Sequence, residues 1–210
     1  DLVRSRGLGD VYKRQILGDL AQGLHSYRSI KGWKELNEEV FEGKAETLEL
    51  LRCYRNTIEI MEAAVVYHEP GDDTVGRPEA VLRHGAPVYR KTLGEGESPV
   101  VELEELIRSW TEKGYHSIAI ITATEKQSKE VAQKLEKKGL TVKQISEKDG
   151  SFVKGVVSVA ANLVKGLEFD CAAVLDVGFQ VYGDPTLSKR LRYVACTRAL
   201  HELAIFKEEV

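Results

Sequence analysis

The chain has 210 residues, and its hydrophobic content of 42% is that of an ordinary globular protein with a buried core. Its 30 lysines and arginines are outnumbered by 33 acidic residues, and the formal charge of -3 excludes a surface that is basic overall. Any contact with nucleic acid must therefore be local.

The cysteines and the apolar runs bear on the cellular compartment of the protein. Cys53, Cys171 and Cys196 are far apart and form no C-x-x-C pair, and the histidines lack metal-ligand spacing. We therefore expect small buried thiols in a reducing compartment and no metal site. No apolar run reaches the roughly 18 residues that cross a bilayer, and we see no signal-peptide pattern. A cytoplasmic protein without a membrane partner is expected.

The chain begins at Asp1, and its only methionine is Met61, so we expect a fragment of a longer reading frame. Residues 1–15 have no apolar periodicity and resemble adapter-derived read-through at the ends of some conceptual translations. We expect them to be a non-native leader that takes no part in the fold.

Few regular elements are predicted in the first half of the chain. Apolar residues ahead of Gly18 and Asp19 are typical of the end of a strand, and helical spacing predicts helices over 47–52 and 57–65. Residues 69–96 are rich in glycine, proline and charge, which predicts a loop with one strand over 87–91.

From residue 98 onward, helical and strand patterns alternate. Ser98 as N-cap and Pro99 at the first helical position predict a helix that Gly114 ends. A strand over 117–122, a helix over 125–138 with Val131 and Leu135 inward, and a short strand over 140–142 follow. These elements form a βαβ unit.

Two later apolar runs, 156–160 and 171–177, do not alternate with polar residues, which predicts strands buried on both faces. Leu187, Leu191 and Val194 mark a helix, and a last strand follows over 203–206. The predicted fold is therefore α/β, with a mainly parallel sheet flanked by helices.

The first cluster of residues with chemical potential is Gly18-Asp19 followed by Gln22, with Tyr27 and Arg28 soon after. A strand that ends in Gly-Asp can present an amide to a bound phosphate, because ligands bind beyond the carboxyl ends of parallel strands. A simple turn closed by glycine and aspartate has the same sequence.

The second cluster is Tyr54-Arg55. An aromatic ring beside a guanidinium can stack on a purine and neutralise charge on a γ-phosphate. A surface pair at a helix boundary is the alternative interpretation.

The third cluster is Lys165-Gly166-Leu167-Glu168, which lies between two apolar runs. Glycine lets the backbone approach a ligand closely, and the acidic residue can accept hydrogen bonds from ribose hydroxyls. A turn that merely connects two strands is the alternative.

The fourth cluster, Y-V-A-C-T-R-A over 193–199, contains Arg198 one helical turn beyond Val194. Its side chain can therefore project from the helix end toward a neighbouring site, as an arginine finger requires. A solvated helical arginine is the commoner outcome for a single residue of this kind.

The order of the four clusters is more specific than any one of them. G-D-x-x-Q with an aromatic residue and an arginine, then Y-R, then K-G-L-E-F-D, and then Y-V-A-C-T-R-A resembles motifs III to VI of the UvrD/Rep superfamily 1 helicases over residues 16–206. The short spacing between motifs IV and V is most similar to the DNA helicase IV and HelD branch. The resemblance implies a RecA-like three-layer fold, with 16–34 as the end of a first RecA-like domain and 35–210 as the second.

The resemblance also implies a role for each matching residue. Gln22, Arg55 and Arg198 would be the catalytic group that senses or reaches the γ-phosphate of ATP. Tyr54 would stack on adenine, and Gly166 and Glu168 would contact the nucleotide. The DNA strand would be contacted by Tyr27, Arg28 and Asn162. The sequence departs from the family pattern at His25, Ser29, Cys53, Ala160, Asn162 and Val164.

The phosphate-binding half of such a site is missing from the sequence. No G-x-x-x-x-G-K-[ST] occurs, and no Asp-Glu pair follows an apolar run. We expect both, with the ligands of Mg²⁺, in an upstream RecA-like domain of the same reading frame, and we expect the fragment alone not to hydrolyse ATP. The implied function is an ATP-dependent 3'-5' DNA helicase or translocase that acts on single-stranded or partly duplex DNA.

Two alternatives stay open from the sequence. The similarity to HelD also implies an ATP-dependent remodelling factor that binds RNA polymerase. A RecA-like module that binds a protein partner without catalysis belongs to another class, and an intact gene without a Walker lysine would favour it.

Overall fold

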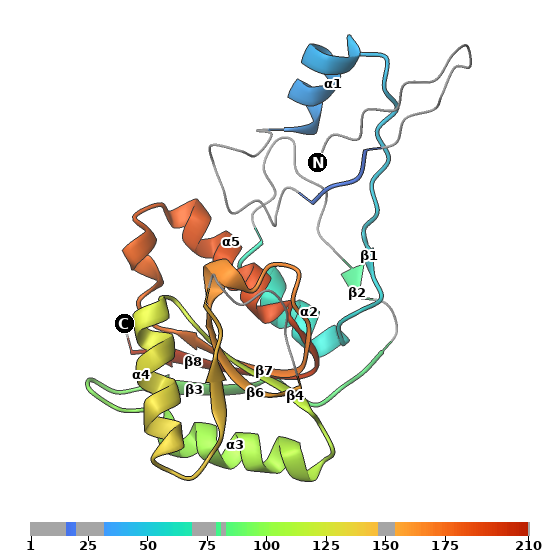
Figure 1. The fold of residues 1–210 in the computed structure, drawn as a ribbon. Coiled ribbons are helices and arrows are strands. Elements are labelled where there is room, and N and C mark those ends of the chain that lie inside the picture. Colours follow the sequence, from blue (N-terminus) through green and yellow to red (C-terminus); the bar gives the residue numbers. More distant parts are fainter. Residues whose placement is uncertain (1–15, 20–31, 69–78, 81–82, 147–153, 210) are drawn as a thin grey trace.

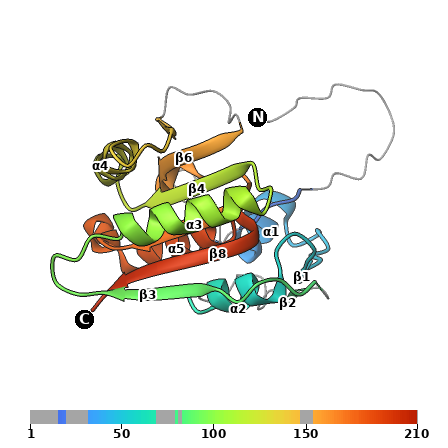
Figure 2. The ribbon, with the colours of Figure 1, turned by 90° about the horizontal axis from the view of Figure 1, so that it is seen from below.

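The computed structural model describes residues 16–19, 32–68, 79–80, 83–146 and 154–209, and its centre is a six-stranded parallel sheet of order β3-β8-β7-β4-β6-β5. Figure 2 shows β3 beside β8 at one side of this sheet and β6 beyond β4. The predicted α/β fold with a parallel sheet is therefore confirmed. The strands are β3 (Tyr89–Leu93), β4 (Ser117–Thr122), β5 (Val142–Gln144), β6 (Gly155–Ala160), β7 (Phe169–Asp176) and β8 (Ala199–Glu208).

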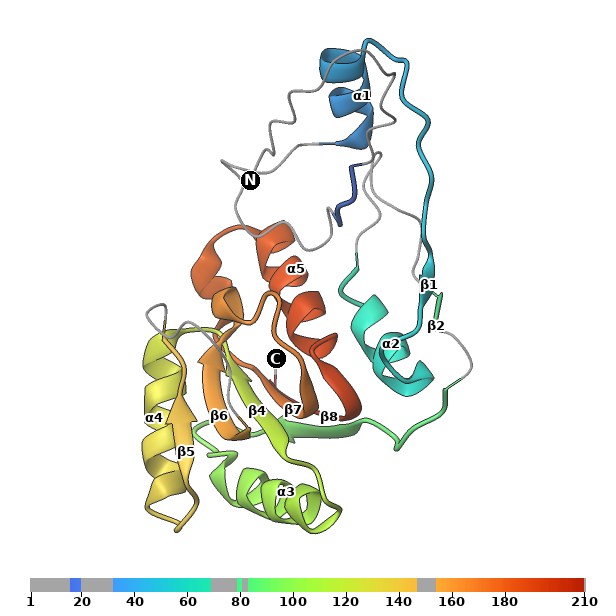
Figure 3. The ribbon, with the colours of Figure 1, turned by 45° about the vertical axis from the view of Figure 1, so that its right-hand side comes forward.

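Helices cover both faces of the sheet (Figure 3). α3 (Val100–Glu112) and α4 (Glu125–Glu136) pack on one face, and α2 (Ile58–Val65) and α5 (Pro185–Cys196) pack on the other. The sheet and its two helical layers form the three-layer arrangement predicted from the sequence. Among the described residues, no helix combines the length and the apolar content that a membrane crossing requires.

Alternation along the strands creates the two cores. Ile120 of β4 belongs to the core under α3 and α4, and its neighbour Ile121 belongs to the core under α2 and α5. Successive strand residues point to opposite faces of a sheet, so a strand covered by helices on both sides must be apolar throughout. This requirement explains the uninterrupted apolar runs of the sequence.

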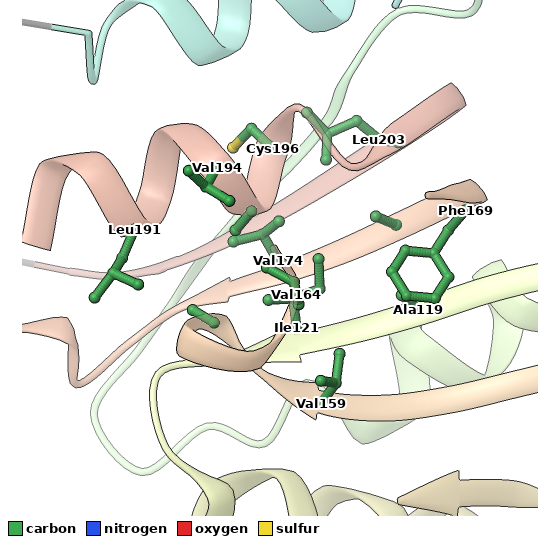
Figure 4. Packing of buried hydrophobic residues seen from close by; sticks show 14 of the residues in the cluster. Ala119, Ile121, Val159, Val164, Phe169, Val174, Leu191, Val194, Cys196 and Leu203 are labelled. Atoms are coloured by element: carbon green, nitrogen blue, oxygen red, sulfur yellow. The ribbon is translucent and has the colours of Figure 1, made fainter. Parts of the chain in front are cut away.

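The core on the α5 side also contains the connection between β6 and β7. This connection begins with the short 3-10 helix η2 (Ala161–Leu163) and leads from the end of β6 to the start of β7. Val164 is fully buried with Leu191 and Val194 of α5, as Figure 4 shows. The connection is therefore anchored in the core by Ala161 and Val164, while most of its other residues are exposed.

The helix starts follow from local capping. The Thr124 hydroxyl accepts a hydrogen bond from the Gln127 amide at 3.2 Å, and the Gln127 side chain accepts one from the Thr124 amide at 3.1 Å. This reciprocal pair is a capping box that fixes the start of α4. Asp184 caps α5 in the same sense, with Pro185 at the first helical position.

Several predicted boundaries differ from the structure by one or two residues. Pro99, and not Ser98, is the N-cap of α3, and the helix ends before Gly114, whose φ of +89° favours glycine. The strand expected over 140–142 is β5, which begins at Val142, and the strand expected over 87–91 is β3, which begins at Tyr89. Both are edge strands, so pairing with one neighbour sets their limits.

The helix predicted over 47–52 is wrong. Residues 47–51 contain no helix, and the next residues form the short strand β1 (Arg52–Cys53), which pairs with β2 (Glu79–Ala80). Leu48 and Leu50 are 80% and 82% exposed, so a helix here has no core to pack against. Short helices are not stable in water without such packing.

The strand end expected ahead of Gly18 is also absent. Residues 16–19 are irregular, and no described strand lies beside them to supply hydrogen bonds. A helix that was not predicted, α1 (Trp33–Phe41), follows and lies apart from the sheet (Figure 1). Its apolar residues Trp33, Leu36, Val40 and Phe41 recur at helical spacing, a pattern that the prediction overlooked, although none of the residues of the helix is buried.

Candidate functional site

Three segments that are separate in the sequence meet at the edge of the sheet where β7 and β8 begin. Arg55 lies between β1 and α2, and Arg198 lies between α5 and β8. Glu168 immediately precedes β7. Phe169 of β7 is paired with Ala199 of β8, so the residues just before these strands lie at the same edge. The structure thus brings together three of the residues predicted for nucleotide binding.

Arg55 and Glu168 form an ion pair, with 3.2 Å between Nη1 and Oε1. Their side chains are 44% and 47% exposed. An ion pair this open to solvent contributes at most about 1 kcal/mol. Arg55 can therefore exchange the carboxylate for another anion at little cost.

Unlike Arg55, Arg198 is buried, with only 2% of the residue exposed. Its Nε donates to the Val194 carbonyl at 3.0 Å, and Nη1 donates to the Leu167 carbonyl at 3.3 Å. The expectation that Arg198 projects from the helix end is therefore corrected. The last carbonyls of a helix lack partners within it, and the guanidinium folds back to satisfy one of them.

The charges of the three residues interact. Burial lowers the pKa of Arg198, and the neighbouring positive charge of Arg55 lowers it further, whereas the carboxylate of Glu168 acts in the opposite direction. The carboxylate of Asp19 acts on Arg198 in the same direction as that of Glu168, so two guanidiniums lie beside two carboxylates at this edge. The guanidiniums supply the donors that match phosphate oxygens.

Tyr54 and Gly166 flank the charged cluster. Tyr54 is 71% exposed, so a face of its ring is open to a planar ligand. Gly166 has a φ of +83°, and a Cβ added there would meet nothing within 4 Å. Backbone conformation, and not space, therefore requires glycine at this position.

The described residues that sequence reasoning missed are Asn56 and Arg83. Nδ2 of Asn56, a residue only 2% exposed, donates to the carbonyls of Thr197 and Ala199 at 3.1 and 2.6 Å. Nη2 of Arg83 donates to the Arg55 carbonyl at 2.7 Å. The polar residue after Tyr-Arg was a weak signal for Asn56, and nothing in the glycine-rich segment before β3 distinguished Arg83.

The predicted contacts to nucleic acid lie elsewhere. Asn162 is exposed in η2, two residues after the end of β6. The strands are parallel, so this position is at the sheet edge opposite to Arg198. Gln22, Tyr27 and Arg28, as well as His25 and Ser29, lie outside the described residues.

The cysteines differ from one another. Cys171 and Cys196 are buried, as expected, and burial raises the pKa of Cys196 to about 12. Cys53 is only partly buried, and its Sγ donates to Oδ1 of Asn56 at 3.3 Å. Within the described ranges, no group of three or more histidine, cysteine or acidic side chains is placed to hold a metal ion.

Comparison with known proteins identifies a solved structure with a similar fold. No protein-family model and no curated protein matches the sequence. The structure is similar to the C-terminal domain of a possible DNA helicase from Lactobacillus plantarum WCFS1, with 23% identity and a TM-score of 0.58, over 73% of this chain and 86% of that chain. At this identity the likeness establishes the fold.

Two other solved structures resemble the chain more weakly. An arterivirus nonstructural protein 10 helicase in complex with DNA has 12% identity and a TM-score of 0.37, over 58% of this chain and 28% of that chain. The Hef helicase domain of Pyrococcus furiosus has 19% identity and a TM-score of 0.35, over 52% of this chain and 24% of that chain. The chain is thus an α/β domain whose fold is that of the Lactobacillus domain.

Proposed function

We propose that this chain is the C-terminal RecA-like part of an ATP-dependent DNA helicase or translocase of the UvrD/Rep type. Its arginines complete an ATP site whose phosphate loop and Mg²⁺ ligands belong to an upstream RecA-like domain. The observation that carries the proposal is the convergence of Arg55, Glu168 and Arg198 at one sheet edge. The resemblance of motifs III to VI and the fold shared with the Lactobacillus domain support it.

The residues present fit a nucleoside triphosphate. Tyr54 offers an exposed ring for stacking on adenine, Glu168 offers a carboxylate for ribose hydroxyls, and Arg55 offers a guanidinium for the phosphates. When the nucleotide binds, Arg55 leaves Glu168 for the γ-phosphate, and Glu168 becomes available to the ribose. The Arg55–Glu168 pair thus keeps both groups oriented toward the cleft until the ligand arrives.

Arg198 acts after a rearrangement of its side chain. Its Nη1 bond to the Leu167 carbonyl is 3.3 Å long, and its Nη2 bond to the Thr197 hydroxyl is 3.2 Å long, both at the long end of the usual range. A phosphate presented by the upstream domain replaces these bonds, while Nε stays on Val194. Positive charge at the γ-phosphate then lowers the barrier to attack by water.

The DNA strand is assigned to the opposite edge of the sheet. Asn162 lies there, and we assign Tyr27 and Arg28 to the same strand from the family pattern. The proposed direction of movement is 3'-5'. Each round of binding and hydrolysis closes and opens the cleft between the two RecA-like domains.

The test uses the intact enzyme, in which this chain follows its upstream domain. Arg198→Ala should abolish ATP turnover while ATP still binds, because the guanidinium acts on the transition state. Lys189→Ala, at an exposed position of the preceding helix α5, is the control. Unchanged turnover in the Arg198 variant would remove the assignment of Arg198 as an arginine finger.

A further inference from the structure

The loop that carries Tyr54 and Arg55 is tied to the turn that carries Arg198 by two side chains that face no ligand. We infer that Asn56 and Arg83 are positioning residues, which set the distance between the two guanidiniums and so control the rate of ATP hydrolysis. This inference rests on the proposed function.

Asn56 binds the turn on both sides of Arg198. Its Nδ2 donates to the carbonyls of Thr197 and Ala199, the residues immediately before and after Arg198, while its Oδ1 accepts from Cys53. Both amide hydrogens of this buried side chain are thus donated to protein. Because the residue is only 2% exposed, we infer that its role is indirect.

Arg83 supplies a second tie from another segment. Its Nη2 donates to the carbonyls of both Arg55 and Leu200, and its Nη1 donates to Nδ1 of His201 at 3.3 Å. The Arg83 carbonyl accepts a hydrogen bond from the Ile58 amide at 3.0 Å, which anchors the residue at the start of α2. One guanidinium therefore bridges the backbones of the two arginine-bearing segments.

The segment of Arg83 reaches this position because of Gly85. A Cβ added at Gly85 would lie 2.6 Å from Cγ2 of Thr57, the N-cap of α2. The Gly85 amide also donates to the Glu59 carboxylate at 2.8 Å. The backbone at Gly85 thus lies against the start of α2. This contact holds the neighbouring Arg83 in position for its bonds to the two segments.

The two ties have a kinetic consequence. Arg55 and Arg198 must reach one triphosphate together, and a displacement of about 1 Å in such a group can slow catalysis about 100-fold. Loss of a tie shifts the guanidiniums slightly but leaves both present and charged, so ground-state binding of ATP is kept. The expected signature is a fall in kcat with little change in KM.

The experiment compares Asn56→Asp and Arg83→Gln in the intact enzyme. Asn56→Asp sets a carboxylate against two carbonyl oxygens, and Arg83→Gln removes the bridge. Each should lower kcat at least about tenfold with KM for ATP within about twofold. Arg83→Lys should not restore kcat, because one ammonium cannot reproduce the fork of the guanidinium.

Asn37→Asp is the matched control, since the Asn37 amide also bonds to backbone, at Ala45, but in the distant α1 region. It should leave kcat unchanged. In this 210-residue chain, hydrogen exchange of the Arg198 amide should be faster in Asn56→Asp and unchanged in Asn37→Asp. If Asn56→Asp does not fold, Asn56→Ser, which keeps one donor, replaces it and should show an intermediate kcat.

The outcomes separate the two claims. Unchanged kcat in the Asn56 and Arg83 variants, together with loss of turnover in Arg198→Ala, would show that the ties do not position the arginines although the proposed function stands. Full turnover in both Arg55→Ala and Arg198→Ala would overturn the proposed function itself. A rise in KM without a fall in kcat would also contradict the positioning role.

Discussion

Nη1 of Arg55 lies 3.2 Å from Oε1 of Glu168, although the two residues belong to different halves of the chain. Both side chains are nearly half exposed, so the pair is a weak contact between two charged groups. A pair of this kind holds its partners in place and gives way when a better anion or hydroxyl arrives.

Replacement of Glu168 by glutamine tests this exchange. We expect Glu168→Gln to change the free energy of unfolding by less than about 1 kcal/mol, because the ion pair is solvent-exposed. In the intact enzyme, KM for ATP should rise several-fold, roughly the effect of about 1 kcal/mol for one weakened hydrogen bond to the ribose. Urea denaturation and steady-state kinetics provide the two measurements. A large loss of stability with unchanged KM would mean that Glu168 has only a structural role.

The acid stability of the chain should depend on Glu59. The hydrogen bond with His84 lowers the pKa of Glu59 from 4.5 to about 2, and the Gly85 amide contributes to the shift. A carboxyl group whose pKa falls on folding stabilises the folded state above the unfolded pKa. This contribution is therefore lost as the pH drops from about 4.5 to about 2.

Denaturation curves between pH 2 and 6 measure this dependence. Glu59→Gln should remove part of the loss of stability at low pH. Glu62→Gln on the same helix is the control, since the structure shows no hydrogen bond for that side chain within the described residues. If the stability of the native chain and of Glu59→Gln fell equally at low pH, Glu59 would not be the cause of the loss.

Thiol labelling distinguishes the three cysteines. Burial raises the pKa of Cys196 to about 12 and also raises that of Cys171, so neither forms the reactive thiolate in the folded chain near pH 8. Cys53 is partly exposed. We expect one thiol to react rapidly with a maleimide under native conditions and all three in denaturant. Rapid native labelling that persists in Cys53→Ser would show that one of the other thiols is accessible.

The sheet was predictable because its signal is local. Strands covered on both faces must be apolar at every position, and 117–122 matches β4 residue for residue. The helix over 57–65 was predictable for a similar reason, since Thr57 is its N-cap and its apolar residues face the core. Such features need only a few neighbouring residues.

What was not predictable depends on contacts between distant segments. Asn56 reaches carbonyls 141 and 143 positions further along the chain, and no local pattern marks these bonds. The orientation of Arg198 was also mistaken, because one of its acceptors, the Leu167 carbonyl, becomes available only when the β6–β7 connection packs beside α5. Motif order indicated which residues converge, and packing decided how each one is held.

The connection between β6 and β7 links two opposite margins of the sheet and is anchored in the core at two positions. It carries Asn162 at one end and Glu168 at the other, and thus spans the sheet from one margin to the other. Ala161 and Val164 are fully buried along the way, and densely packed interiors transmit strain instead of absorbing it. Under the proposed function, the packed residues of this connection would pass a displacement at Asn162 on to Glu168, without any need for the whole domain to deform.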